Sequence, residues 1–162
     1  MLYIFSAMVQ GERKIKVIAN NRKAFHEYEI IMRLEAGIEL RGTEVKSLRA
    51  GKIQMADAYA VVDGGEVILL NLHISQYDMA HQDNHDPTRP RRLLLNRREI
   101  RKLWGATNEK GFTIIPLKIY FSGPYAKVEI GVGRGKKKYD KRQAIAKRDA
   151  DREIERRLRD HK

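Results

Sequence analysis

Two glycine-containing turns, each between stretches of alternating apolar and polar residues, most constrain what this chain can fold into. The first turn, residues 63–65, lies between candidate strands at 58–62 and 66–72. The second turn, residues 122–124, lies between candidate strands at 112–121 and 125–132. Glycine accepts the positive φ angles that tight hairpin turns require. Alternation with a period of two is typical of strands with one buried face. The sequence therefore predicts two antiparallel hairpins and a mainly β fold.

Further strands are expected at residues 28–35 and 37–41. Pro116 cannot donate a ladder hydrogen bond, so its strand should be an edge strand or contain a bulge. Short strands joined by tight turns, with a few helices, suggest a small closed antiparallel barrel of the OB type. Periodicity alone fits a small barrel and a sandwich equally well.

Two short helices should interrupt the strands. We expect Thr43 to cap the first, which runs to Leu48 and ends at Gly51. Asn96 should cap the second, with Glu99 completing a capping box. Ile100, Leu103 and Trp104 should form the buried stripe of this helix, and Gly105 should end it.

Charge is concentrated at the end of the chain. The 162 residues carry 33 Lys and Arg against 21 Asp and Glu, a formal charge of +12. Residues 133–162 hold 13 basic and six acidic residues, more than half of that excess. The glycines of residues 131–135 are interpreted as a hinge. We expect a disordered N-terminal extension at 1–17, a barrel at 18–132, and a basic tail at 133–162 that is disordered in the free protein.

Composition also limits the setting in which the protein works. The chain contains no cysteine, which excludes disulfides and thiolate metal sites and fits a cytoplasmic location. No apolar run approaches the roughly 20 residues that a membrane span needs, so no membrane partner is expected. The apolar first nine residues lack the basic start of a signal peptide, and we expect Met8 to be the working start.

No pattern indicates catalysis. The sequence has neither a phosphate-binding Gly-x-x-x-x-Gly-Lys loop nor a Gly-x-Ser-x-Gly nucleophile elbow. His81, Asp83 and His85 lie close together, but their spacing matches no standard metal signature. We expect no metal and no cofactor. A metal-dependent RNA-processing enzyme that uses His81 and His85 remains the alternative.

Unmixed positive charge favours RNA as the partner. Seven cations surround residues 93–95 within 14 positions, namely Arg89, Arg91, Arg92, Arg97, Arg98, Arg101 and Lys102, against the single acid Glu99. A solvated helix face usually mixes both signs, whereas arginine density of this kind suits phosphates and bases. A second patch surrounds Tyr139 and consists of Arg134, Lys136, Lys137, Lys138, Lys141 and Arg142. A generic OB-fold RNA-binding protein with a nonspecific basic tail is the rival interpretation.

Four segments resemble the SmpB family, in the order that the family has them. They are residues 21–28 (NRKAFHEY), 42–52 (GTEVKSLRAGK), 86–100 (DPTRPRRLLLNRREI) and 135–142 (GKKKYDKR). The resemblance runs from about residue 18 to the C-terminus. Phe25 departs from the family, which commonly has a basic residue or tyrosine there.

The resemblance implies a noncatalytic, monomeric adaptor with an OB-like barrel. Its partners would be the tRNA-like domain of transfer-messenger RNA and the stalled ribosome, where the tail becomes helical in the decoding centre and mRNA channel. The family's RNA-binding positions correspond to Glu35, Leu94, Asn96 and Lys127. The decoding-centre motif corresponds to Asp140, Lys141 and Arg142, next to Tyr139.

Overall fold

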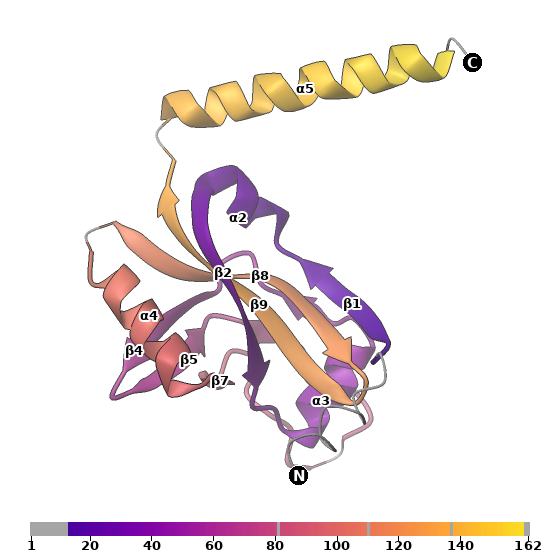
Figure 1. The fold of residues 1–162 in the computed structure, drawn as a ribbon. Coiled ribbons are helices and arrows are strands. Elements are labelled where there is room, and N and C mark those ends of the chain that lie inside the picture. The colour runs from indigo at the N-terminus through magenta and orange to yellow at the C-terminus, as the bar shows by residue number, and fades with distance from the viewer. Residues whose placement is uncertain (1–12, 81, 110, 137, 161–162) are drawn as a thin grey trace, which may run out of the picture.

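The computed structural model describes residues 13–80, 82–109, 111–136 and 138–160 (Figure 1). Its strands are β1 (Ile15–Asn20), β2 (Tyr28–Ile38), β3 (Ile53–Gln54), β4 (Tyr59–Asp63), β5 (Glu66–Leu70), β6 (His73–Ile74), β7 (Arg91–Leu94), β8 (Phe112–Ser122) and β9 (Tyr125–Gly135). Its helices are α2 (Arg22–Glu27), α3 (Gly42–Arg49), α4 (Arg97–Thr107) and α5 (Lys138–Asp160). The mainly β class with a few helices is confirmed.

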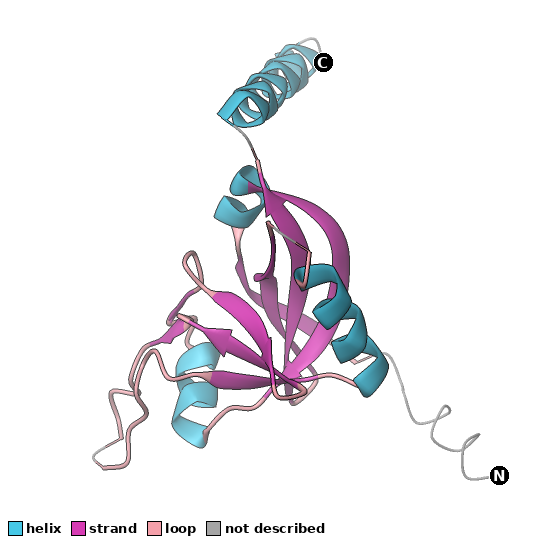
Figure 2. Ribbon diagram, turned by 90° about the vertical axis from the view of Figure 1, so that its left-hand side faces the viewer, coloured by secondary structure: helices cyan, strands magenta, loops and turns pink. Residues whose placement is uncertain are grey.

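The long strands pair in a circuit. From β8 the antiparallel pairings run through β4, β5, β7, β2 and β9, and β9 pairs again with β8. β1 joins outside this circuit, on β8, and Figure 2 shows the strong curvature of the sheet. The circuit surrounds an apolar core to which α3 and α4 each contribute a fully buried leucine, Leu48 and Leu103.

Both predicted hairpins are present. β4 and β5 are joined through Gly64 and Gly65, whose φ angles are +57° and +77°. β8 and β9 turn at Gly123, with φ +57°. The predicted bulge at Pro116 is also confirmed, because the β8–β9 register shifts between Pro116 and Lys118.

Several predicted boundaries were wrong. The two strands expected at 28–35 and 37–41 are the single strand β2, which has its irregularity between Ile30 and Met32. The α3 N-cap is Arg41, and Thr43 lies inside the helix. α4 continues past Gly105 to Thr107, since Asn108 N–H donates to the Trp104 carbonyl at 2.9 Å.

The glycine-rich hinge expected at 131–135 is part of β9. A Cβ atom on Gly131 would lie 2.8 Å from Leu117 Cδ1, and one on Gly133 would lie 3.0 Å from Ile30 Cδ1. These glycines therefore allow close packing of neighbouring strands and do not act as a hinge. The sheet also begins earlier than expected, because β1 starts at Ile15.

The expected tail is the helix α5, which projects from the body of the protein (Figures 1 and 2). Its residues favour helix, and Arg157 donates to Glu153 one turn earlier at 3.0 Å. Side chains along 145–160 are exposed, so little tertiary packing supports this helix. The expected disorder of the tail in the free protein stays a prediction, which rapid amide exchange along α5 would bear out. Each helix in the described ranges is too short or too polar to span a lipid bilayer.

Candidate nucleic-acid interface

A row of residues crosses four neighbouring strands on one face of the sheet. Leu94 of β7 lies opposite Gly37 of β2, Gly37 lies opposite Lys127 of β9, and Lys127 lies opposite Tyr120 of β8. Directly opposed residues present their side chains on the same face. Two predicted RNA-binding residues that are distant in sequence, Leu94 and Lys127, are thus brought together.

Gly37 keeps the centre of this row open. A Cβ atom there would lie 3.2 Å from Leu94 Cβ, so any larger residue would press against the leucine. Leu94 keeps 49% of its surface exposed. An exposed leucine beside a lysine offers an apolar contact and a cation to one ligand.

Glu35 lies on the same face, two residues before Gly37. The Lys127 ammonium is 3.9 Å from Glu35 Oε1, and the Tyr120 hydroxyl donates to Glu35 Oε2. Burial and this hydrogen bond to Glu35 raise the pKa of Tyr120 well above its ordinary value, so the phenol stays protonated and fixes the carboxylate. Sequence reasoning missed Tyr120, although a correctly registered β8–β9 hairpin would have placed it opposite Lys127.

Asn96 joins this face to α4 and has a structural role. Its Oδ1 accepts from Glu99 N–H at 2.9 Å, and the Glu99 carboxylate accepts from Asn96 N–H at 3.1 Å. The predicted capping box is therefore confirmed. The side-chain NH₂ group of Asn96 has no partner among the described residues, so it can donate to a ligand while the oxygen caps the helix.

Two of the predicted RNA-binding arginines are instead held by a buried carboxylate. Glu44 of α3 and Arg91 of β7 are both fully buried. Arg91 Nε is 3.3 Å from Glu44 Oε1, and its other nitrogens donate to the carbonyls of Leu72 at 2.6 Å and Pro87 at 3.0 Å. Arg89 also binds Glu44 with two nitrogens. The prediction that Arg91 contacts RNA is wrong for this structure, since its guanidinium is inside the protein.

The pKa of Glu44 shows which forces dominate in this cluster. Burial alone would raise that pKa, but the hydrogen bonds from Arg89 and from the Arg41 N–H, with the charge of Arg91, hold it below its ordinary value. Glu44 is therefore ionised at neutral pH and balances Arg91.

The remaining predicted arginines of this region are exposed. Arg92 lies on the outer face of β7 with Leu94, but it pairs with Glu39 at 3.0 Å and Glu66 at 3.2 Å. Arg97 and Arg98 of α4 form no ion pair with a described residue. These two cations are free to meet phosphate.

The tail leaves the sheet at the opposite end of β2 from the row. Tyr28 pairs with Gly135, whereas Gly37 pairs with Lys127, a separation of nine residues or about 30 Å along an extended strand. Lys136 donates from its backbone to the Glu27 carbonyl at 2.8 Å and from its ammonium to the Phe25 carbonyl at 3.1 Å. Lys136 thus links the end of β9 to α2. The sequence predicted it only as an RNA contact.

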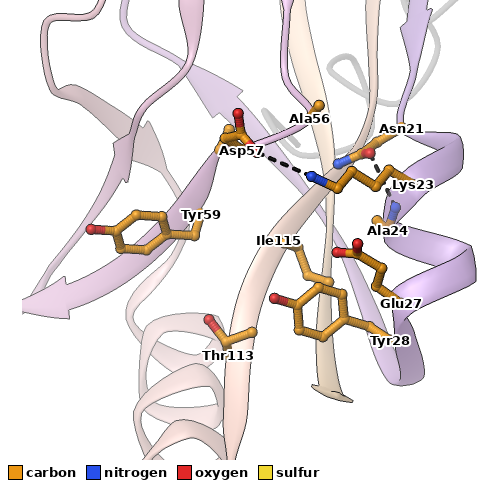
Figure 3. A pocket seen from close by; sticks show the side chains of 11 residues that line it. Asn21, Lys23, Ala24, Glu27, Tyr28, Ala56, Asp57, Tyr59, Thr113 and Ile115 are labelled. Carbon is orange, nitrogen blue, oxygen red and sulfur yellow. Dashed lines mark hydrogen bonds and ion pairs between the residues drawn. The ribbon is translucent and has the colours of Figure 1, made fainter. Parts of the chain in front are cut away.

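α2 itself is fixed to the sheet around a hollow of about 220 Å³ (Figure 3). The buried Asn21 caps α2 by accepting from Ala24 N–H at 3.1 Å, and its amide donates to the Pro116 carbonyl at 2.9 Å. Lys23 pairs with Asp57 across the mouth at 3.2 Å. The end of β9 next to α2 is therefore held by several hydrogen bonds.

The predicted tail residues lie at the start of α5. Lys138, Tyr139, Asp140 and Lys141 belong to its first turn and Arg142 follows with an exposed side chain, whereas Lys137 lies outside the described residues. The structure thus separates these residues from the row on the sheet.

The surroundings of His85 do not support the alternative of a metal-dependent enzyme. This histidine is fully buried, with its Nδ1 2.9 Å from the Thr43 hydroxyl and its Nε2 2.8 Å from the Ile74 carbonyl. Both ring nitrogens have protein partners. His81 lies outside the described residues, and no three His, Asp or Glu side chains within the described ranges converge on a metal-sized site.

The fold and this face define a small β protein with a mixed polar and apolar exposed face and a separate basic helix. The chain belongs to the SmpB family, whose model matches residues 18–160. An SsrA-binding protein of Carboxydothermus hydrogenoformans is 56% identical over 144 residues, which are 89% of this chain and 97% of that protein. One from a Geobacillus species is 55% identical over 153 residues, 94% of this chain and 97% of the relative.

A solved structure agrees with this assignment. A chain in "tmRNA-SmpB: a journey to the center of the bacterial ribosome" is 47% identical and superimposes with a TM-score of 0.65. The match covers 80% of this chain and 94% of that one.

Proposed function

We propose that this protein is a noncatalytic RNA-binding adaptor of trans-translation. It binds the tRNA-like domain of transfer-messenger RNA, delivers that RNA to stalled ribosomes, and inserts its basic tail into the decoding centre and mRNA channel. The observation that carries the proposal is the row in which Leu94, Gly37 and Lys127 meet beside Glu35. The names of the relatives and of the solved complex support the same RNA and the same ribosome.

The proposal assigns an OB-like barrel to the body of the protein. The closed circuit of antiparallel pairings supports this description, because small barrels of this type bind nucleic acid on an exposed strand face. Lys127 neutralises phosphate, Leu94 packs on an unstacked base, and Glu35 accepts hydrogen bonds from base or 2′-hydroxyl donors.

The separation of the row from α5 supports two distinct tasks for one chain. A contact surface about 30 Å from the tail along β2 leaves the tail accessible after the RNA has bound. The tail motif Asp140-Lys141-Arg142 would then meet ribosomal RNA, where α5 offers an exposed cationic helix.

A comparison of two RNAs tests the function directly. At physiological salt the protein should shift the tRNA-like domain of transfer-messenger RNA at concentrations that leave an unrelated tRNA free. A generic RNA-binding protein would bind both equally and lose both as salt rises, since nonspecific binding is mostly counterion release. Equal binding would reject the proposal in favour of that rival.

Replacing Lys127 by alanine should weaken binding of the tRNA-like domain and flatten its salt dependence. One lost phosphate contact lowers the slope of log K against log salt by about 0.9. The measurement is a set of binding isotherms across salt concentrations. Lys23→Ala is the control, because Lys23 lies in the α2 region away from the row and, among the described residues, pairs with exposed Asp57 alone. An equal drop in slope there would contradict the assignment.

The two roles of Asn96 can be separated by two substitutions. Asn96→Ser keeps an N-cap oxygen but removes the NH₂ donor, so RNA affinity should fall while stability changes little. Asn96→Ala removes both and should in addition lower the free energy of unfolding by about 1 kcal/mol. Parallel melting and gel-shift experiments measure the two effects. If Asn96→Ser bound RNA normally, Asn96 would be a helix cap alone.

A further inference from the structure

Trp104 is exposed, although the sequence predicted it to lie in the buried stripe of α4. It is the single tryptophan of the chain, and 56% of its surface is accessible. α4 turns Leu103 into the core and leaves the neighbouring indole outside. Single exposed apolar side chains are common on protein surfaces, but an exposed aromatic ring that borders an apolar hollow is typical of an interaction site.

The indole borders an apolar hollow of about 310 Å³ between α4 and the β4–β5 turn. Its lining consists of Val62, Gly64, Gly65, Ile100, Arg101 and Trp104. The two glycines carry the positive φ angles of the turn, and no atom lies within 4 Å of where a Cβ would be. The glycines of the turn thus leave open space next to the ring.

Cations line the same face of the helix. Arg97, Arg101 and Trp104 are spaced at i, i+4 and i+7, so they lie in one row along α4. None of the cations of α4 forms an ion pair with a described residue. An apolar hollow lined by Arg101, with Arg97 one turn earlier in the same helix row, fits a flat ring attached to an anion. That is the chemistry of an unpaired nucleotide.

We propose that this hollow binds an unpaired RNA base, which stacks on Trp104 while Arg97 and Arg101 contact its flanking phosphates. The site rests on the proposed RNA-binding function and adds a contact separate from the Leu94–Gly37–Lys127 row. Stacking tolerates any base, because every base has a π face. Leu94 of the row precedes the Asn96 cap by two residues, and the helix that Asn96 caps lines the hollow. One RNA strand can therefore engage both.

The lone tryptophan makes the test direct. Addition of a short unstructured RNA oligonucleotide should quench the indole fluorescence, whereas an abasic oligonucleotide of the same length should bind more weakly and leave the emission unchanged. Unchanged emission with the intact RNA, or equal quenching by the abasic strand, would overturn base stacking. In the first case the hollow would be left for a protein partner.

Substitutions give a second readout. Trp104→Ala should weaken oligonucleotide binding about tenfold, the loss of one stacked base, and Trp104→Phe should recover part of that affinity. Met79→Ala, which removes another exposed apolar side chain (71% accessible), should bind like the parent protein. Thermal melting of each variant confirms that the exposed positions leave folding intact; equal affinity of Trp104→Ala and parent would reject the site.

The outcomes separate this site from the adaptor function. If the protein prefers the tRNA-like domain and Lys127→Ala weakens that binding, while RNA leaves the Trp104 emission unchanged and Trp104→Ala binds like the parent, the hollow is rejected and the adaptor function stands. If Trp104 stacks on the oligonucleotide but the tRNA-like domain is not preferred over unrelated tRNA, the adaptor function is rejected and the hollow stands.

Discussion

Replacing Glu44 by glutamine should lower the free energy of unfolding by about 3–5 kcal/mol. Removing one partner of a buried ion pair leaves the other charge without compensation in a low-dielectric interior. Arg91 would be that charge, since it and Glu44 are both fully buried. Urea unfolding followed by circular dichroism measures the difference.

An exposed ion pair supplies the control for this prediction. Asp57→Asn removes the partner of Lys23, and Asp57 has a side chain that is 82% exposed, so the expected loss is below about 1 kcal/mol. If Glu44→Gln cost no more than Asp57→Asn, the Glu44 cluster would not support the fold.

The same variant should alter acid stability. The folded pKa of Glu44 lies below its ordinary value of 4.5, so its stabilising contribution is complete above that value and is lost as pH falls through the lowered pKa. The stability gap between parent and Glu44→Gln should therefore shrink in acid. A gap that stayed constant down to strong acid would contradict this linkage.

Ending the chain after Lys136 should abolish tagging of stalled nascent chains while leaving most RNA affinity. The truncation removes α5 but keeps β9, whose pairing with β2 extends to Gly135, and keeps the Lys136 bonds to α2. Because the charged side chains of α5 at 142–160 are exposed and screened at physiological salt, affinity for the tRNA-like domain should fall less than about tenfold. Gel shifts and a reconstituted tagging reaction measure the two activities.

Lys127→Ala is the reciprocal variant. It keeps the whole tail and should lose affinity for the RNA, with tagging restored at high protein concentration. Should the truncated chain lose much more than about tenfold in affinity for the tRNA-like domain, the division between sheet and tail would be wrong.

Local signals in the sequence predicted local structure well. The Asp63-Gly64-Gly65 turn and the Asn96–Glu99 capping box are present as expected, because backbone preferences and nearby hydrogen bonds determine both. The orientation of α4 was not predictable in the same way. Ile100, Leu103 and Trp104 are all apolar, and only the angle at which the helix docks decides that Leu103 is buried and Trp104 exposed.

Glycines were ambiguous without their neighbours. Gly131 and Gly133 suggested a hinge, yet they lie inside β9, where Leu117 and Ile30 occupy the space that a side chain would need. Flexibility and close packing both favour glycine, so sequence alone could not separate them.

The sequence by itself determined the mainly β class, the two hairpins, the concentration of positive charge, and the likeness that pointed to an RNA-binding adaptor. Each follows from composition or from residues that are neighbours in the chain. Tertiary structure alone decided which cations face water: Arg91 sits against Glu44 in the interior, while Arg97 is free at the surface. It also decided that Leu94 and Lys127 meet across Gly37, because no hairpin turn connects β2 to β7 or to β9 and fixes the register of those distant strands.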